Sequence, residues 1–272
     1  MAETLNLTSV CEFLERFAPS QLAESWDNVG LLVGDQTQSI EGIVTCLTVT
    51  PEVVDEAIEA DADLIVTHHP MPFRPLKQIT TDNTVGQMLL KLIQNKIAVY
   101  SPHTAFDSCA EGINHQLATG IGLTGVRPLV PVDLLDAPEP TSLVGTGRWG
   151  KFAEGSMPLA RIAELAKQVT SAPMVKVVGR GTAEIESVAV GCGSAGELLS
   201  ATIENKVGCL ILGETSFHTC LEAKAQNVAL VLVGHYASER FAVEKLATVL
   251  SEAFPTANVW SSRQEADPIH FA

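Results

Sequence analysis

Residues 64–70 read LIVTHHP, and this stretch decides how the rest of the chain is interpreted. Leu64 to Thr67 have the apolar and β-branched side chains of a buried strand, and two adjacent histidines and a proline follow them. On a continuing strand, neighbouring side chains point to opposite faces. Because Pro70 ends the strand here, both imidazoles can turn inward, one to each of two metal ions. LIVTHHP therefore predicts the end of a buried strand that carries two metal ligands.

Strand-like and helix-like segments alternate on both sides of this stretch, which predicts α/β layering. In two places the sequence also predicts where a helix begins. Ser9 and Glu12 have the spacing of a capping box, and Ser108 and Glu111 have it again. The fold class expected from this alternation is α/β, with mixed sheets flanked by helices.

The sequence also predicts an internal repeat. Residues 94–107 read QNKIAVYSPHTAFD and residues 226–239 read QNVALVLVGHYASE. In both, an apolar strand follows Gln-Asn, and a histidine then precedes an acidic residue by four positions. We expect two related α/β units, roughly residues 43–119 and 186–250, that face each other across a pseudo-twofold. The proline-rich residues 127–142 are interpreted as a linker or surface loop.

Composition narrows the class of protein. The chain has 272 residues and a formal net charge of −15, which argues against a dedicated nucleic-acid binder and against anionic membranes. No apolar run is long enough to span a bilayer, and the acidic N-terminal stretch lacks the pattern of a signal peptide. The six cysteines form no C-x-x-C pair and are interpreted as small buried residues in a reducing compartment. We therefore expect a cytoplasmic protein.

Polar side chains that suit a metal follow several predicted strands. In open parallel sheets the carboxyl ends of the strands are where sites are built. Alone, a histidine there is more often an ordinary hydrogen-bonded side chain, and an acid more often stabilises a helix dipole. Together, imidazoles and carboxylates suit a borderline divalent ion such as Zn, Fe, Mn, Co or Ni. The residues concerned are His68, His69, His103, Asp107, Glu214, His218, His235 and Glu239.

Six stretches taken in order resemble one known family over essentially the whole chain. They are SWDNVGLLVGD, THHPMPF, SPHTAFD, GCGSAGEL, GETSFH and GHYASERF. The chain resembles the GTP cyclohydrolase 1 type 2 homologues, also called NIF-three-like dinuclear metal centre hexameric proteins. The resemblance implies a metal-site lobe of residues 1–127 and 234–272 with a second α/β lobe, residues 128–233, inserted into it. It also implies two divalent metal ions per chain and a toroidal homo-hexamer whose metal sites face an internal cavity.

The resemblance also assigns roles to individual residues. It implies that Glu239 bridges two ions, that His68 and Asp107 bind one of them, and that His69 and His235 bind the other. His103 is expected beside them as a catalytic acid or base. Ala105 departs from the asparagine of the commoner family pattern, which leaves the ligands intact and alters only the rim.

Two divalent ions can generate a hydroxide nucleophile and polarise the bond under attack. The expected activity is therefore hydrolysis of nucleotides or phosphate-bearing small molecules, and the family name suggests opening of the GTP purine ring. Arg74, Glu214 and His218 are the expected substrate-binding residues, although Arg74 and Lys77 equally suit ordinary surface charges. The alternatives are a non-enzymatic, metal-dependent hexameric scaffold or regulator, and a protein that stores metal.

Two further segments are left with two interpretations each. The glycine-rich stretch GCGSAGEL suits either a phosphate bound by main-chain N–H groups or tight packing alone. Asp27 and Asn28 suit either a role in shaping the site or the capping of a turn.

Overall fold

The computed structural model describes residues 5–132 and 143–270. The chain divides into two compact units, Met1–Phe106 with Ala242–Ala272, and Asp107–Phe241. The second unit is therefore inserted into the first. Its first border lies between residues 106 and 107, inside α4 (His103–Ser108), and its second lies between residues 241 and 242, inside α9 (His235–Ala253). The borders expected for the second lobe were residues 128 and 233. Which unit holds the metal stays a prediction.

The first unit is built on a mixed five-stranded sheet with the order β1-β4-β3-β2-β13. Four neighbouring strands run parallel, and only β1 is antiparallel to its neighbour β4. The central strands are fully buried, which explains their near-continuous apolar sequences. The strands are β1 (Gly30–Val33), β2 (Gly42–Cys46), β3 (Leu64–Thr67), β4 (Ala98–Ser101) and β13 (Asn258–Ser261).

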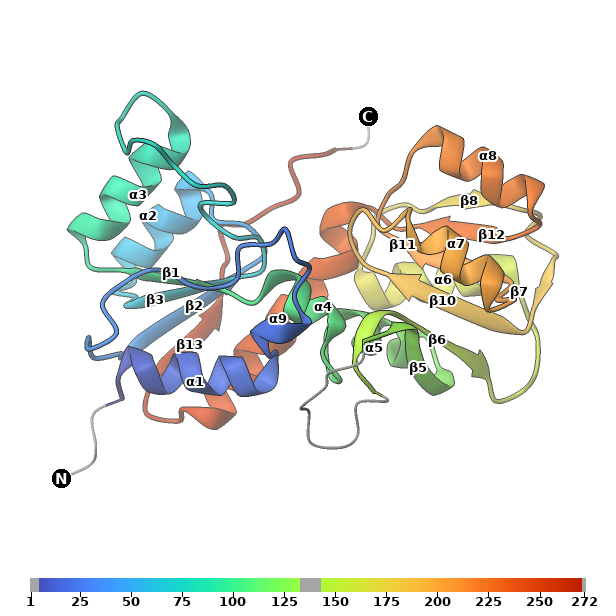
Figure 1. The fold of residues 1–272 in the computed structure, drawn as a ribbon, viewed down its shortest axis with the longest axis horizontal. Coiled ribbons are helices and arrows are strands. Elements are labelled where there is room, and N and C mark those ends of the chain that lie inside the picture. Colours follow the sequence, from blue (N-terminus) through green and yellow to red (C-terminus); the bar gives the residue numbers. More distant parts are fainter. Residues whose placement is uncertain (1–4, 133–142, 271–272) are drawn as a thin grey trace. The chain divides into compact units, whose positions relative to one another are not determined.

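Helices cover both faces of this sheet (Figure 1). On one face lie α2 (Pro51–Glu59) and α3 (Thr84–Gln94), which share a buried core with the central strands. On the other lie α1 (Leu7–Phe17), followed by the 3-10 turn Ser20–Leu22, and the second half of α9. The predicted helix start at Ser9 is wrong, because the Asn6 side chain caps α1 and accepts the Ser9 N–H.

The second unit is built on a mixed six-stranded sheet with the order β5-β6-β10-β11-β12-β8. Strands β10, β11 and β12 run parallel, and the strands flanking them are antiparallel. A short ladder of β7 with β9 lies apart from this sheet. The strands are β5 (Leu123–Pro131), β6 (Gly145–Phe152), β7 (Met157–Pro158), β8 (Lys176–Val178), β9 (Glu184–Ile185), β10 (Ser187–Gly191), β11 (Cys209–Leu212) and β12 (Ala229–Leu232).

This sheet too has a buried apolar core on each face. One core includes α5 (Ile113–Gly120) and α6 (Leu159–Thr170), and the other includes α7 (Leu198–Glu204) and α8 (Phe217–Ala225). The predicted helix start at Ser108 is wrong: α4 ends there and α5 begins only at Ile113. The carbonyls of Ser108 and Cys109 instead accept hydrogen bonds from the buried Arg148 guanidinium, which fixes the chain between the two helices.

The architecture agrees with the predicted fold class of α/β units with mixed sheets and flanking helices. His103 and His235 each begin a helix after a parallel strand of their own unit, β4 and β12. The internal repeat itself stays a prediction. Among the residues that the structure describes, no helix combines the length and the apolar character needed to cross a membrane.

Candidate metal centre

The backbones of His68 and His69 continue the hydrogen-bond ladder between β3 and β2. The His68 N–H donates to the Cys46 carbonyl at 3.0 Å, and the His69 N–H donates to the Leu47 carbonyl at 2.8 Å. The Ser101 hydroxyl, from β4, donates to the His68 carbonyl at 2.6 Å. The sheet therefore holds the backbone of both histidines rigidly, which is a requirement for a site that must keep its geometry.

Three imidazoles gather at this end of the first unit. The ring centroids of His68 and His69 are 5.1 Å apart, and that of His103 lies 5.1 Å and 5.7 Å from them. Each residue offers a ring nitrogen, and these three nitrogens lie within 4.8 Å of one another. Thr48 hydrogen-bonds Nδ1 of His69 at 2.7 Å and so orients that ring. Neutral imidazoles in this arrangement can bind a divalent cation.

Asp27 holds His103 in place. Its buried carboxylate lies 2.7 Å from Nδ1 of His103 and accepts hydrogen bonds from the Thr104 N–H and hydroxyl. His103 has a φ of +27°, an uncommon value for a residue with a side chain, so the surrounding contacts must stabilise this backbone. Burial opposes ionisation of Asp27, but the hydrogen bonds from His103 and Thr104 outweigh it and lower its pKa to about 2. Asp27 therefore shapes the site, which the sequence left undecided.

Replacing Asp27 with asparagine is expected to cost about 2 kcal/mol of unfolding free energy in the metal-free protein at pH 7. A carboxyl group with a lowered pKa stabilises the fold at pH values above its ordinary pKa of 3.8. This stabilisation is lost as the pH falls towards the folded-state pKa of about 2. The difference between wild type and Asp27→Asn should therefore shrink over that range. Urea unfolding from pH 7 to pH 2.5 measures it.

The matched control for Asp27 is Glu59→Gln, an exposed carboxyl at the end of α2. Its cost should stay within about 0.5 kcal/mol at every pH. A pH-independent cost for Asp27→Asn would contradict the assigned role of the Asp27 charge.

The second unit carries donors of its own at the ends of its parallel strands. His235 begins α9, and Glu239 lies one turn later with a carboxylate oxygen 3.3 Å from Nε2 of His235. Glu214, which follows β11, lies 3.0 Å from Nδ1 of the same ring. Only 3 % of the Glu239 surface is exposed, so this carboxylate is almost entirely removed from water. A buried carboxylate beside an imidazole is a suitable pair of ligands for a metal.

The hydrogen bond to Glu239 raises the pKa of His235 to about 9, against the opposing effect of burial, and Glu214 adds to it. In the metal-free protein His235 is therefore protonated at neutral pH. Its contribution to stability is present below the ordinary pKa of 6.5 and is lost as the pH rises through about 9. Protons and metal compete for this ring, so metal affinity should rise over the same range.

Asp107 is tied to the strand ends of the second unit. The Cys192 thiol, directly after β10, donates to the Asp107 carboxylate at 3.1 Å. Asn114 donates to the Asp107 carbonyl at 3.2 Å and accepts the Cys192 N–H at 2.7 Å. Burial raises the pKa of Cys192 well above its usual value, and the carboxylates of Asp107 and Glu239 add to this effect. Cys192 is therefore a neutral thiol that positions Asp107.

The glycine-rich segment after β10 is explained by close packing. A side chain at Gly193, whose φ is +61°, would collide with the Glu239 carboxylate. The Gly193 N–H already donates to the Ser238 hydroxyl at 2.9 Å, and the Cys192 N–H is engaged by Asn114. Two of the main-chain donors that a phosphate would need are thus bound within the protein. Packing is the better supported of the two interpretations.

The predicted substrate-binding residues lie at the surface of their units. Arg74 follows β3 in an exposed segment, and His218 is exposed at the start of α8, where its ring lies 6.2 Å from that of Phe217. Glu214 is half-exposed beside His235. Their roles, like those of the predicted ligands, stay predictions.

The sequence analysis missed two residues that position Asp107, Cys192 and Asn114, although Cys192 follows a strand end as the histidines do.

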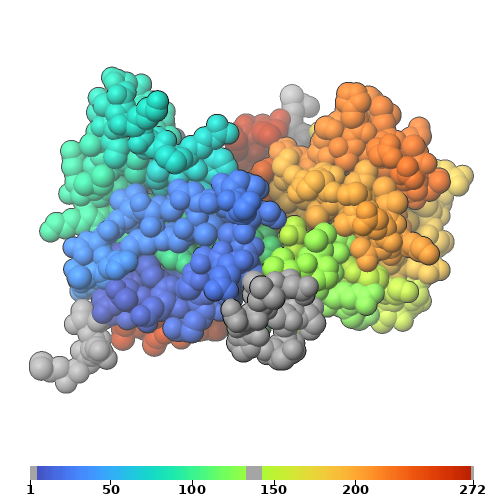
Figure 2. All heavy atoms as spheres, in the orientation of Figure 1, coloured from blue at the N-terminus to red at the C-terminus, as the bar shows by residue number. Residues whose placement is uncertain are grey.

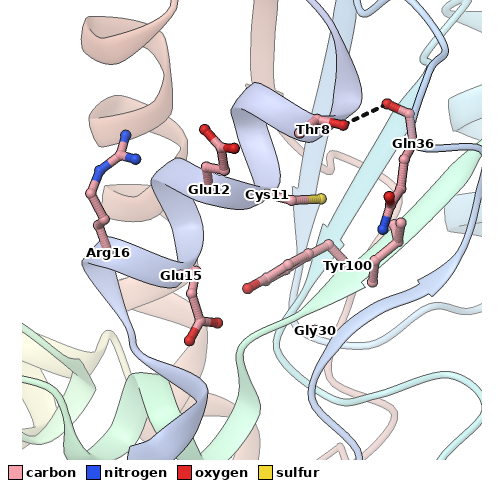
Figure 3. A pocket seen from close by; sticks show the side chains of 9 residues that line it. Thr8, Cys11, Glu12, Glu15, Arg16, Gly30, Gln36 and Tyr100 are labelled. Atoms are coloured by element: carbon pink, nitrogen blue, oxygen red, sulfur yellow. Dashed lines mark hydrogen bonds between the residues drawn. The ribbon is translucent and has the colours of Figure 1, made fainter.

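A cavity of about 520 Å³ also lies in the first unit, between α1 and the strands β1 and β4. Figure 3 shows Tyr100 pointing into it, and the Thr8 hydroxyl bound to the Gln36 carbonyl at its rim. Burial raises the pKa of Cys11 to about 11, so its thiol is not a nucleophile at neutral pH. Glu15 already accepts two hydrogen bonds from Ser20. The cavity lacks the convergent donors that the histidine cluster offers.

Comparison with known proteins identifies relatives along the whole chain. A family model described as Duf34/NIF3 (NGG1p interacting factor 3) matches residues 5–268. A GTP cyclohydrolase 1 type 2 homolog of Clostridium acetobutylicum is 32% identical over 98% of this chain and 99% of its own. The NIF3-like protein 1 of Drosophila melanogaster is 34% identical over 97% of this chain and 88% of its own.

Solved structures share the fold. A Bacillus cereus protein related to NIF3 superimposes with a TM-score of 0.88 at 22% identity over the full length of both chains. Reduced HcgD from Methanocaldococcus jannaschii superimposes with a TM-score of 0.80 at 27% identity, over 96% of this chain and 99% of its own.

Proposed function

The chain belongs to the Duf34/NIF3 family, and from this premise we propose that it is a dinuclear divalent-metal protein that hydrolyses nucleotides or phosphate-bearing small molecules. The observation that carries the proposal is the cluster of three imidazoles whose nitrogens lie within 4.8 Å of one another. The printed name of the Clostridium acetobutylicum relative supports a purine nucleotide such as GTP as the substrate, with ring opening as the reaction.

The donors present fit such a metal centre. We propose that His68 and Asp107 hold one ion, His69 and His235 hold the other, and Glu239 bridges them. When bound, a pair of divalent ions supplies Lewis acidity that polarises the bond under attack and promotes the ionisation of water near neutral pH. Imidazole and carboxylate ligands suit Zn, Fe, Mn, Co or Ni.

The residues around the ligands supply orientation and proton transfer. Asp27 faces Nδ1 of His103, so proton exchange with a substrate falls to Nε2 of that ring. The Asp27 carboxylate would also stabilise the charged imidazolium after His103 accepts a proton. Arg74, exposed after β3, would contact an anionic group of the substrate. The homo-hexamer implied by the resemblance is part of the proposal.

Replacing His103 with glutamine is expected to lower turnover by about 10²- to 10⁴-fold, the usual contribution of a positioned acid or base. The ligands remain in this variant, so the metal content per chain should stay close to that of wild type. His69→Ala, in contrast, should lose both metal and turnover. Loss of purine absorbance with GTP and phosphate release from a panel of phosphoesters measure the activity, and elemental analysis measures the metal.

His270→Gln is the matched control, because His270 is exposed near the C-terminal end. It should leave turnover and metal content unchanged. Absence of turnover with every metal tested, or full activity in His103→Gln, would favour the non-enzymatic scaffold instead.

A further inference from the structure

Two exposed aromatic rings flank His103. The Trp26 side chain is 61% exposed and the Phe73 side chain is 46% exposed. Their centroids lie 6.1 Å and 6.2 Å from that of His103, and both rings meet the imidazole in a T-shaped arrangement. The centroids of Trp26 and Phe73 are themselves 6.1 Å apart, and the two ring planes are inclined by 58°. Single exposed aromatic residues are common on proteins, but here two of them lie beside the same imidazole, and grouped exposed rings mark binding sites.

The segments that carry these rings are held together by hydrogen bonds. The Asn28 side chain donates to the Pro72 carbonyl at 2.8 Å, which ties the turn of Trp26 to the residue before Phe73. The Glu24 N–H donates to the Thr104 hydroxyl at 2.9 Å, and the Asp27 carboxylate binds His103 and Thr104. Residues 25–28, SWDN, therefore link the two rings to the histidine: Trp26 has an exposed side chain, Asp27 binds His103, and Asn28 binds the segment of Phe73.

We infer that Trp26 is a stacking platform for the planar base of a purine nucleotide at the edge of the histidine cluster, and that the tilted Phe73 ring packs against the edge of that base. The inference rests on the proposed function, and it adds that the base, rather than the phosphates, lies beside His103. Every base has a π face, and an exposed indole held at a fixed angle is a suitable partner for it.

The net charge of the chain favours a ligand that is bound partly through its uncharged base and not through its phosphates alone. The chain has a formal net charge of −15, so long-range electrostatics disfavour a polyanion. Two cations, Arg74 and Lys77, follow Phe73 in the same exposed segment, which lies in the cyan-to-teal part of the surface in Figure 2. A ring platform followed by local cations matches the chemistry of a nucleotide, which has a flat base and an anionic tail.

The test is binding of GMP to the metal-free protein, followed by Trp fluorescence and by calorimetry. Trp26→Leu is expected to weaken GMP binding about tenfold or more, within the range for loss of one stacked base. Trp26→Phe should retain most of the affinity, because it keeps an aromatic face. Phe73→Leu should weaken binding by several fold. The fluorescence change on binding should disappear in Trp26→Phe, while the calorimetric heat persists.

Two variants and one probe serve as controls. Phe217→Leu removes an aromatic side chain that is 73% exposed on α8, and Leu76→Ser removes an apolar side chain from the segment of Phe73. Neither should change GMP affinity. Inorganic phosphate, which lacks a base, should bind equally well to wild type and Trp26→Leu.

Three results would overturn the inference. The first is unchanged GMP affinity in Trp26→Leu, and the second is no measurable GMP binding by wild type. The third is a change in oligomer mass without a change in GMP affinity, which would assign these rings to an interface between copies of the chain. Turnover of the metal-loaded protein is measured separately, so a failure of the platform and a failure of the hydrolase proposal are distinguishable.

Discussion

Glu239→Gln is expected to bind divalent metal at least about 100-fold more weakly than wild type, because even partners of metal ligands contribute 10- to 100-fold. The Glu239 carboxylate is almost entirely buried and lies one helical turn after His235. Glutamine keeps the shape of the side chain but removes the negative charge that would offset two cations. Metal titration followed by calorimetry, with elemental analysis of the purified protein, measures the loss.

The matched control is Glu252→Gln, which makes the same chemical change at an exposed position of the same helix. It should bind metal as wild type does. Equal affinities in Glu239→Gln and Glu252→Gln would remove Glu239 from the site.

Arg148→Met is expected to lower the free energy of unfolding by at least about 3 kcal/mol, because it leaves several buried acceptors without a donor. Only 1% of the Arg148 surface is exposed. Its guanidinium donates to five main-chain carbonyls at 2.5–3.0 Å, those of Ser108, Cys109, Leu143, Gly145 and Gly147. Burial lowers the pKa of Arg148, but a guanidinium stays charged at neutral pH.

The matched control is Arg127→Met. Arg127 is exposed, and its guanidinium lies 4.0 Å from the centroid of the Trp149 ring, so its loss should cost no more than about 1 kcal/mol. Urea unfolding of both variants gives the comparison. Because Arg148 fixes the two residues after Asp107, its replacement should also weaken metal binding. Equal stability of the two variants would show that the carbonyls find other donors.

The sequence was most informative where its signals are local. LIVTHHP places two histidines directly after a strand, and His103 and His235 follow β4 and β12. A change from an apolar run to a polar residue marks a strand end without any knowledge of the partners. The alternation of such runs with helical segments was therefore enough to predict the α/β class.

The parts that could not be predicted depend on contacts between residues far apart in the chain. Asp27 binds His103 across 76 positions, and Cys192 binds Asp107 across 85. Neither pair leaves a periodic pattern. Arg148 looks like an ordinary charged residue in a glycine-rich stretch, yet it is buried and fixes the turn where a helix start was expected. Capping-box spacing likewise missed that Asn6, ahead of Ser9, caps α1.

The central claim is the proposed dinuclear centre, and anomalous scattering from crystals grown with Mn²⁺ or Zn²⁺ tests it most directly. The account predicts two peaks per chain, no more than about 4 Å apart as in other two-metal sites. Glu239 should lie between them, and His68, His69, Asp107 and His235 should surround them. A single ion held by the three histidines alone, or no ion near Glu239, would contradict it.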